Sequence, residues 1–226
     1  MPRDTESLIN KVNMEFLPSL AVFLAFTGAA FVITITPGPD MTLFLGRALS
    51  QGKSAGLAAM AGAMTGLVIH TLLAAFGISA LLAASPSGFL ALKITGAIYL
   101  LWLAIDAIRN GSAFTLNDDK AKKTGFLNNW LTGVGINMLN PKIIIFFITF
   151  LPQFVSLEDT NAAPKIIFLG LYFVVFATIS CSLIIYAVDS VAELLKKNKR
   201  VTRMIDWLFA GIFSAFAIRI LFTESA

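Results

Sequence analysis

The chain has 226 residues, of which 57% are hydrophobic and 13% charged, and its mean hydropathy is +0.82. An ordinary soluble domain carries about 25% charged and 45–50% apolar residues, so this composition excludes one. The 20 Phe residues, with many aliphatic ones, exclude a disordered chain. One cysteine and one histidine are too few for a disulfide or for a Cys- or His-rich metal centre. The composition therefore predicts an all-α polytopic membrane protein, and the net charge of +4 is interpreted as membrane topology rather than as nucleic-acid binding.

Six segments are apolar and long enough to cross a bilayer, which takes roughly 20 residues. They are residues 18–36, 55–83, 88–108, 126–151, 165–188 and 204–222. Proline punctuates their ends, so Pro152 is expected to close the fourth span and Pro164 to precede the fifth.

The spans predict one transmembrane transporter domain, residues 18–226, after an N-terminal extension, residues 1–17. A polar loop, residues 110–125, joins its halves, residues 18–109 and 126–222. The extension does not resemble a signal peptide, and Met14 is an alternative start to Met1.

The distribution of basic residues predicts an orientation. Eleven of the 17 Lys and Arg residues follow the first, third and fifth spans: Arg47, Lys53, Arg109, Lys120, Lys122, Lys123, Lys196, Lys197, Lys199, Arg200 and Arg203. Because basic loops stay in the cytoplasm, both termini are expected outside it.

Two spans are interrupted at proline motifs in corresponding places. The first motif is Thr36, Pro37, Gly38, Pro39 and Asp40, and the second is Asn137, Asn140, Pro141 and Lys142. Three spans per half is an odd number, which predicts two inverted three-helix repeats, each with its first helix interrupted. In many secondary transporters such paired interruptions mark the solute site.

The interruptions free polar backbone groups inside the membrane. Proline has no N–H, so Pro37, Pro39 and Pro141 are expected to leave three carbonyls without helical donors, those of Ile33, Ile35 and Asn137. Freed carbonyls suit an ammonium group, and a new helix N-terminus suits a carboxylate. Asn140 and Pro141 are typical of an N-cap and a first helical position. The motifs thus predict a site for a zwitterionic solute; a helix bend without a ligand is the alternative.

Asp40 and Lys142 follow the two break prolines with opposite charges. Ionisable groups inside a membrane are functional candidates. The hypothesis is that they approach one another, with Asp40 as proton acceptor or ammonium site. In the alternative, both side chains extend to the membrane interfaces.

His70 shares one helical face with four small residues of the second span: Ala55, Ala59, Gly62 and Gly66. The small residues are typical of close helix packing. His70 is therefore expected to face the bundle, as a proton relay or as a structural histidine.

Several motifs together resemble the LysE/RhtB family of bacterial amino-acid exporters. They are Thr36-Pro37-Gly38-Pro39-Asp40, Ser50-Gln51-Gly52 with Ala55-Gly56, Gly96-Ala97-x-Tyr99-Leu100-x-Trp102-Leu103, Asn140-Pro141-Lys142 with Phe146-Phe147, and Leu151-Pro152-Gln153-Phe154-Val155. The resemblance implies proton-linked export of amino acids or similar metabolites across the bacterial inner membrane, by a monomer or small homo-oligomer.

The sequence therefore predicts a secondary transporter and not an enzyme, with an amino-acid solute, protons and membrane lipid as partners and with no cofactor or metal. It does not identify the solute. The alternatives are an intramembrane enzyme that uses Asp40 with His70 or Lys142 on a lipid-soluble substrate, and a non-transporting membrane scaffold.

Overall fold

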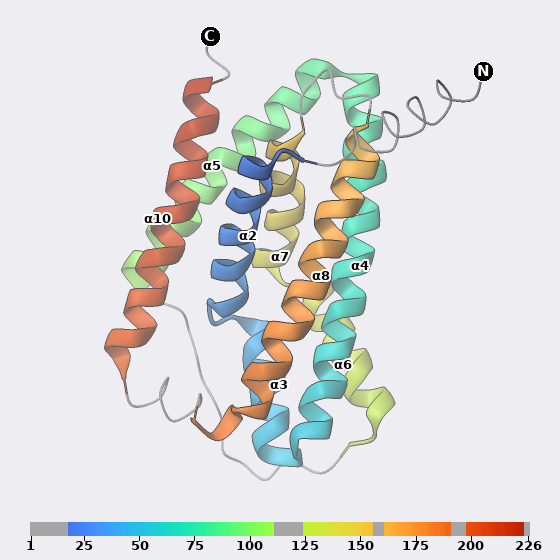
Figure 1. Cartoon of the computed structure of the whole chain (residues 1–226), viewed down its shortest axis with the longest axis vertical. Coiled ribbons are helices and arrows are strands. Elements are labelled where there is room, and N and C mark those ends of the chain that lie inside the picture. Colours follow the sequence, from blue (N-terminus) through green and yellow to red (C-terminus); the bar gives the residue numbers. More distant parts are fainter. Residues whose placement is uncertain (1–17, 111–123, 156–160, 191–197, 224–226) are drawn as a thin grey trace, which may run out of the picture.

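The computed structural model describes residues 18–110, 124–155, 161–190 and 198–223, and every regular element in these ranges is helical (Figure 1). The elements are α2 (Leu20–Ile35), α3 (Pro39–Gln51), α4 (Lys53–Ala84), α5 (Pro86–Asn110), α6 (Phe126–Met138), α7 (Pro141–Ile145), the π-helix η1 (Phe146–Phe150), the 3-10 helix η2 (Leu151–Phe154), α8 (Ala162–Tyr186) and α10 (Lys199–Thr223). The predicted all-helical class is confirmed. The extension 1–17, Met14 included, and most of the polar loop lie outside the described residues.

Two of these helices, α4 and α8, are long and apolar enough to cross a membrane. Two bent pairs also qualify if each is one span: α2 with α3, bent by 51°, and α6 with the helix that continues from Pro141 to Phe154, bent by 53°. Both predicted interruptions are therefore real bends. The third and sixth predicted spans form α5 and α10, which pack against each other but are not among these candidates. The count of six spans stays a prediction.

The structure corrects two expected helix ends. Pro152 does not close the fourth span, because the chain continues through it as η2 to Phe154. Pro164 does not precede the fifth span but lies within the first turn of α8, which begins at Ala162. Proline is tolerated there because the first N–H groups of a helix have no partner inside the helix.

Helices α4 and α6 pack so closely that glycine is required on both. A Cβ atom on Gly62 would meet the Trp130 carbonyl oxygen, and one on Gly133 would meet the Ala59 carbonyl oxygen. The packing interpretation of the small-residue face of α4 is confirmed. This contact positions the candidate site, because Asn137 lies one turn beyond Gly133.

Aromatic side chains fasten the second broken helix to its neighbours. The Phe146 ring lies 6.0 Å from that of Phe26 on α2, 5.1 Å from that of Phe150 and 4.9 Å from that of Phe173 on α8, measured between centroids. All four side chains are buried. Aromatic pairs at such separations add about 0.5–1.5 kcal/mol each to the burial of their area.

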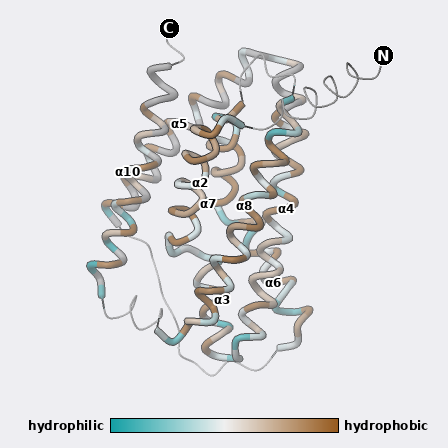
Figure 2. The backbone as a smooth tube through the Cα atoms, viewed as in Figure 1, coloured by the Kyte–Doolittle hydropathy of each residue, from teal (hydrophilic) through white to brown (hydrophobic). Residues whose placement is uncertain are grey.

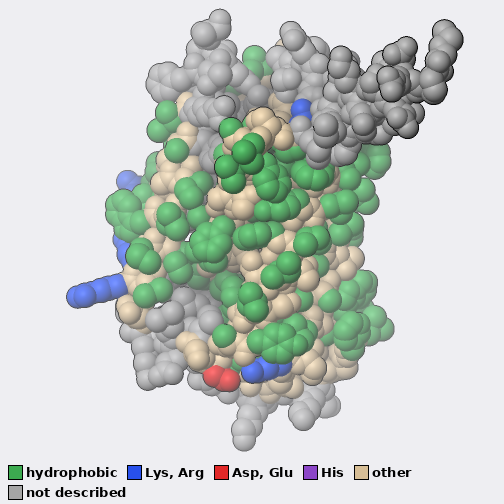
Figure 3. Space-filling view, viewed as in Figure 1, with side chains coloured by type: hydrophobic (Ala, Val, Ile, Leu, Met, Phe, Trp, Pro, Cys, Tyr) green, Lys and Arg blue, Asp and Glu red, His purple; other side chains and the backbone are tan. Residues whose placement is uncertain are grey.

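The outer face of the bundle is apolar. On α8 the exposed side chains of Leu171, Val175, Ile179 and Leu183 recur every fourth residue, while another face of the helix is buried. Figure 2 shows hydrophobic residues along the helices, and Figure 3 shows hydrophobic side chains over the middle of the visible face. Contiguous exposed apolar area of this kind is typical of a lipid-facing surface.

The ends of the helices agree with the predicted grouping of basic residues. The starts of α4 and α10, with Lys53 on the first and Lys199, Arg200 and Arg203 on the second, lie toward the lower end of the bundle in Figure 1. The start of α2 and the end of α10 lie toward the upper end. Which end faces the cytoplasm stays a prediction.

Candidate functional site

The first break leaves backbone carbonyls open. Helix α2 ends at Ile35, and Thr36 adopts an extended conformation. Pro37 has no N–H for the Ile33 carbonyl, which would be its partner in a continuous helix. Helix α3 begins at Pro39. The residue at its N-cap position is Gly38, which is extended and has no side chain that could cap the helix.

At the second break, residues of the break itself satisfy the backbone hydrogen bonds. Helix α7 begins with Pro141, and the side chain of Asn140 accepts a hydrogen bond from the Lys142 backbone N–H at 3.1 Å. The predicted N-cap and first helical position are confirmed. The prediction that the Asn137 carbonyl lacks a hydrogen-bond donor is wrong, because this carbonyl accepts from the Asn140 N–H at 3.0 Å. The end of α6 tightens into a shorter-range bond, a common way to satisfy terminal carbonyls.

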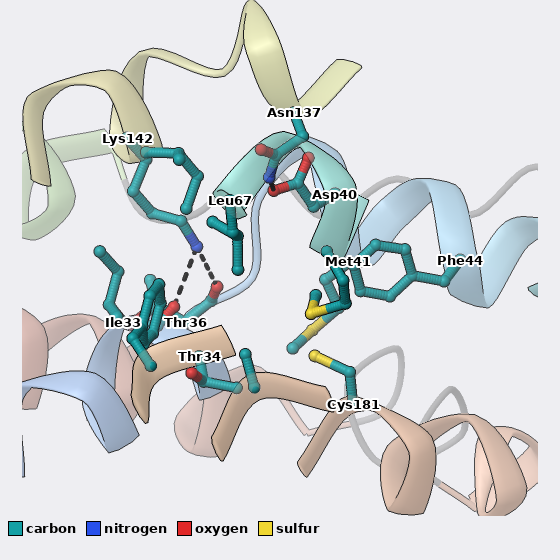
Figure 4. Close-up of a pocket in the computed structure, with 14 residues that line it drawn as sticks. Ile33, Thr34, Thr36, Asp40, Met41, Phe44, Leu67, Asn137, Lys142 and Cys181 are labelled. Atoms are coloured by element: carbon teal, nitrogen blue, oxygen red, sulfur yellow. Dashed lines mark hydrogen bonds between the residues drawn. The ribbon is translucent and has the colours of Figure 1, made fainter. Parts of the chain in front are cut away.

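Each break bonds to a polar side chain of the other (Figure 4). The Lys142 ammonium Nζ donates to the Ile33 carbonyl at 3.1 Å and to the Thr36 carbonyl at 2.8 Å. In return, the Asn137 amide Nδ2 donates to the Asp40 carboxylate Oδ2 at 2.8 Å. The end of the Lys142 side chain therefore lies at the first break.

Asp40 and Lys142 share a cavity without forming a direct ion pair. Both line it, but the side chain of each bonds to the opposite break. The two residues therefore approach one another, as hypothesised, in the sense that both line one cavity. Asn137 and Asn140 take part through their side chains and Thr36 through its carbonyl. Gly38 lies against the Lys142 ammonium.

The cavity between the breaks is small. About 40 Å³ is open to the centres of water molecules, which is room for about two or three of them. Its lining residues are Ile33, Thr34, Thr36, Asp40, Met41, Phe44, Met64, Leu67, Asn137, Lys142, Ile143, Phe173, Ala177 and Cys181. A solute the size of leucine would require the walls to move apart.

Three buried polar atoms at the breaks have no hydrogen-bond partner among the described residues. They are the acceptors Asp40 Oδ1 and Asn137 Oδ1 and the donor Asn140 Nδ2. Leaving such a group unsatisfied costs about 1–3 kcal/mol. Unpaired buried groups of both kinds suit a ligand that carries a donor and an acceptor.

Sequence reasoning missed the apolar wall of the cavity. On α8, Phe173, Ala177 and Cys181 recur every fourth residue and face it. On α3, Met41 and Phe44 line the same cavity as Asp40. Helical spacing could have found both sets, but apolar residues are so common in this chain that the spacing does not stand out.

His70 lies outside the cavity lining. It is buried, as expected for a residue that faces the bundle, and its ring stacks on that of Phe147 with centroids 5.5 Å apart. Its Nε2 has no hydrogen-bond partner among the described residues. A relay role stays a prediction. Within the described ranges, no group of three or more His, Cys, Asp or Glu side chains could hold a metal ion.

An all-helical membrane fold with a cavity between two bent helices, lined by a few polar residues among apolar ones, is typical of secondary transporters. A sequence model of the LysE type translocator family matches residues 31–224. The chain belongs to this family and is a multi-pass bacterial membrane protein. The family consists of transporters, which excludes the intramembrane enzyme.

Several curated proteins are similar to the chain over most of their length. A leucine efflux protein of Enterobacter sp. (strain 638) is 27% identical over 88% of this chain and 94% of its own. A homoserine/homoserine lactone efflux protein of Salmonella typhimurium is 29% identical over 64% and 70%. An uncharacterised membrane protein of Bacillus subtilis, YrhP, is 29% identical over 78% and 87%. No solved structure matches the chain.

Proposed function

We propose that this protein exports amino acids or related small zwitterions across the bacterial inner membrane, driven by the inward proton gradient. The domain that does so spans residues 18–226, with six transmembrane helices in two inverted three-helix repeats. The observation that carries the proposal is the exchange of hydrogen bonds between two broken helices around one cavity.

The polar atoms at the breaks suit the two charged ends of an amino acid. The carbonyls of Ile33 and Thr36 and the unpaired Asp40 Oδ1 are acceptors for an ammonium group. The unpaired Asn140 Nδ2 is a donor for a carboxylate. The small cavity and the unpaired atoms favour a transporter over a scaffold, in which we expect the breaks to be fully packed.

The names of two relatives support an amino-acid solute. One is a leucine efflux protein and the other a homoserine/homoserine lactone efflux protein, and leucine and homoserine are both zwitterions. Their side chains differ in polarity, and homoserine lactone has no carboxylate, so the charged group that all the named solutes share is the ammonium. The first break offers acceptors for that group, and the second offers a donor for a carboxylate where the solute has one.

Coupling follows if a proton and the solute ammonium compete for Asp40. A carboxylate that accepts a proton no longer attracts an ammonium group, so protonation releases the solute and deprotonation readmits it. A proton that enters from outside would then be exchanged for a solute that leaves the cell. Asp40 is therefore the coupling residue in this proposal.

The test is transport in proteoliposomes with an imposed pH gradient and a panel of labelled amino acids. We expect the wild-type protein to move at least one of them, and Asp40→Asn to respond to the gradient about tenfold less or weaker still, because an amide binds no proton. Asp189→Asn, which changes an exposed carboxylate near the end of α8, is the matched control and should transport like wild type.

Two results would contradict the proposal. Gradient-driven transport that persists undiminished in Asp40→Asn removes the coupling role of this residue. No movement of any amino acid of the panel by folded wild-type protein removes the substrate class.

A further inference from the structure

The Lys142 ammonium lies where the proposed function needs the ammonium group of the solute. It donates to the carbonyls of Ile33 and Thr36, and its carbon stem comes from the other half of the chain, 109 residues from Ile33. We propose that Lys142 is a tethered substitute for the solute ammonium, which fills the carbonyl site when no solute is bound and so allows the empty carrier to reorient. This inference rests on the proposed function.

The carbonyl site requires an occupant in every state. Pro37 removes the backbone donor of the Ile33 carbonyl, and Thr36 lies at the end of α2 with its carbonyl beyond the helix. Inside a membrane, an unsatisfied carbonyl costs several kcal/mol, by order of magnitude. A carrier without solute and with both carbonyls unsatisfied would stay in the state in which water hydrates these carbonyls, and it could not reorient.

Lys142 can leave this site without losing all its partners. Lysine is a point charge on a flexible stem, so its three donors can change acceptors by rotation of the side chain. The unpaired Asp40 Oδ1 lies in the same cavity and makes no ion pair with Lys142 in this structure. When a solute ammonium takes the carbonyls, the Lys142 ammonium moves toward Asp40, whose ionised carboxylate has about four lone-pair sites and can accept from both ammonium groups.

Gly38 keeps the resting position of the ammonium open. A Cβ atom at this residue would lie 3.1 Å from Lys142 Nζ and 3.4 Å from Lys142 Cε. The Gly38 backbone is extended, with φ of −165°, so any residue can adopt it. The space that its missing side chain leaves is the space that the ammonium group needs.

Lys142 in this role matters for net efflux of solute but not for exchange of one solute molecule for another. Net efflux requires the carrier to return empty, whereas exchange of solute for solute requires only loaded crossings. Without the Lys142 ammonium the loaded carrier still has a solute ammonium on its carbonyls, and the empty carrier has nothing. Loss of Lys142 should therefore convert the protein into an exchanger.

The experiment compares Lys142→Met with wild type in proteoliposomes, using an amino acid that the wild type transports. Net efflux should fall about tenfold or more, because the lost hydrogen bonds involve a charged group. Exchange should stay within about twofold of wild type. The control is Lys53→Met, which removes an exposed lysine whose ammonium donates to the Tyr186 carbonyl at 2.8 Å. It should leave both rates unchanged.

Equal loss of efflux and exchange in Lys142→Met, in protein that keeps the unfolding temperature of wild type, would overturn the inference. Failure of the wild type to move any amino acid in either assay would instead remove the proposed function, and this inference with it.

A second variant tests the same point if Lys142→Met does not fold. Gly38→Ala displaces the ammonium by a few tenths of an ångström without removing its charge. Net efflux should fall more than exchange, by a smaller factor than in Lys142→Met. A fall of the same size in both assays, or none in either, would contradict the inference.

Discussion

The two helix breaks occupy corresponding places in the two halves and bend the chain by similar angles, 51° and 53°, yet they satisfy their backbones differently. The second break uses its own residues: Asn140 caps α7 and donates its N–H to the Asn137 carbonyl. The first break has Gly38 at the capping position and no side-chain cap. Its carbonyls accept from Lys142, which belongs to the other half.

This difference shows how a repeated bend can become a site in one half and a support in the other. A break whose own residues satisfy its backbone carbonyls does not depend on the other half for their donors. A break that depends on a distant side chain is open to any group that offers the same donors. In the proposed function the first break is therefore the receptor for the solute ammonium, while the second supplies the competing ammonium of Lys142 and the amide that holds Asp40.

The largest expected difference between the two breaks comes from removing a proline from each half. Pro37→Ala frees Thr36 from the restriction that a following proline imposes and gives the Ile33 carbonyl a helical donor. Because a hydrogen bond to a charged group contributes about 1.5–3 kcal/mol, losing this acceptor should lower transport by about tenfold or more. The measurement is amino-acid efflux from proteoliposomes.

Pro141→Ala is the matched control for that prediction. The Asn137 carbonyl already has a donor in Asn140, so a restored N–H at position 141 adds little. Transport should fall by less than about threefold. Equal losses in the two variants would mean that the breaks are equivalent, contrary to the structure.

A smaller effect is expected for the bond that links the halves through Asp40. In a double-mutant cycle of Asp40→Ala and Asn137→Ala, the coupling in the free energy of unfolding should be about 1.5–3 kcal/mol, because one partner is charged. Denaturant titration in detergent micelles measures it.

The Thr27 and Tyr172 hydroxyls, 3.0 Å apart between α2 and α8, provide a neutral reference pair. The cycle of Thr27→Val and Tyr172→Phe should give a coupling of about 0.5–1.5 kcal/mol. A coupling at Asp40 no larger than this reference would show that its carboxylate bears no charge in the folded protein.

The smallest expected effect concerns the cap of the second break and is measured in the free energy of unfolding. Asn140→Ala removes the cap of α7 and should lower the free energy of unfolding by about 0.5–2 kcal/mol, while Asn140→Ser keeps a capping oxygen and most of the stability. The same titration in micelles checks both variants. If Ala and Ser at this position prove equally stable, the side-chain cap contributes nothing.

Particular residues show how far the sequence could be followed. The helices and both interruptions were predicted because proline and apolar length act locally, and Asn140 was identified as an N-cap for the same reason. The helix ends at Pro152 and Pro164 were wrong, because proline permits a 3-10 turn or a first helical turn as readily as it ends a helix.

The candidate site divides in the same way. The position of Pro37 is enough to predict that the Ile33 carbonyl lacks a helical donor, because the missing N–H lies four residues further along the chain. That Lys142 supplies the donor and that Asp40 bonds to Asn137 can be seen only in the folded arrangement. Those partners lie 97 or more residues apart, and their meeting depends on the close packing of α4 with α6 and on the aromatic contacts of η1, which no local pattern specifies.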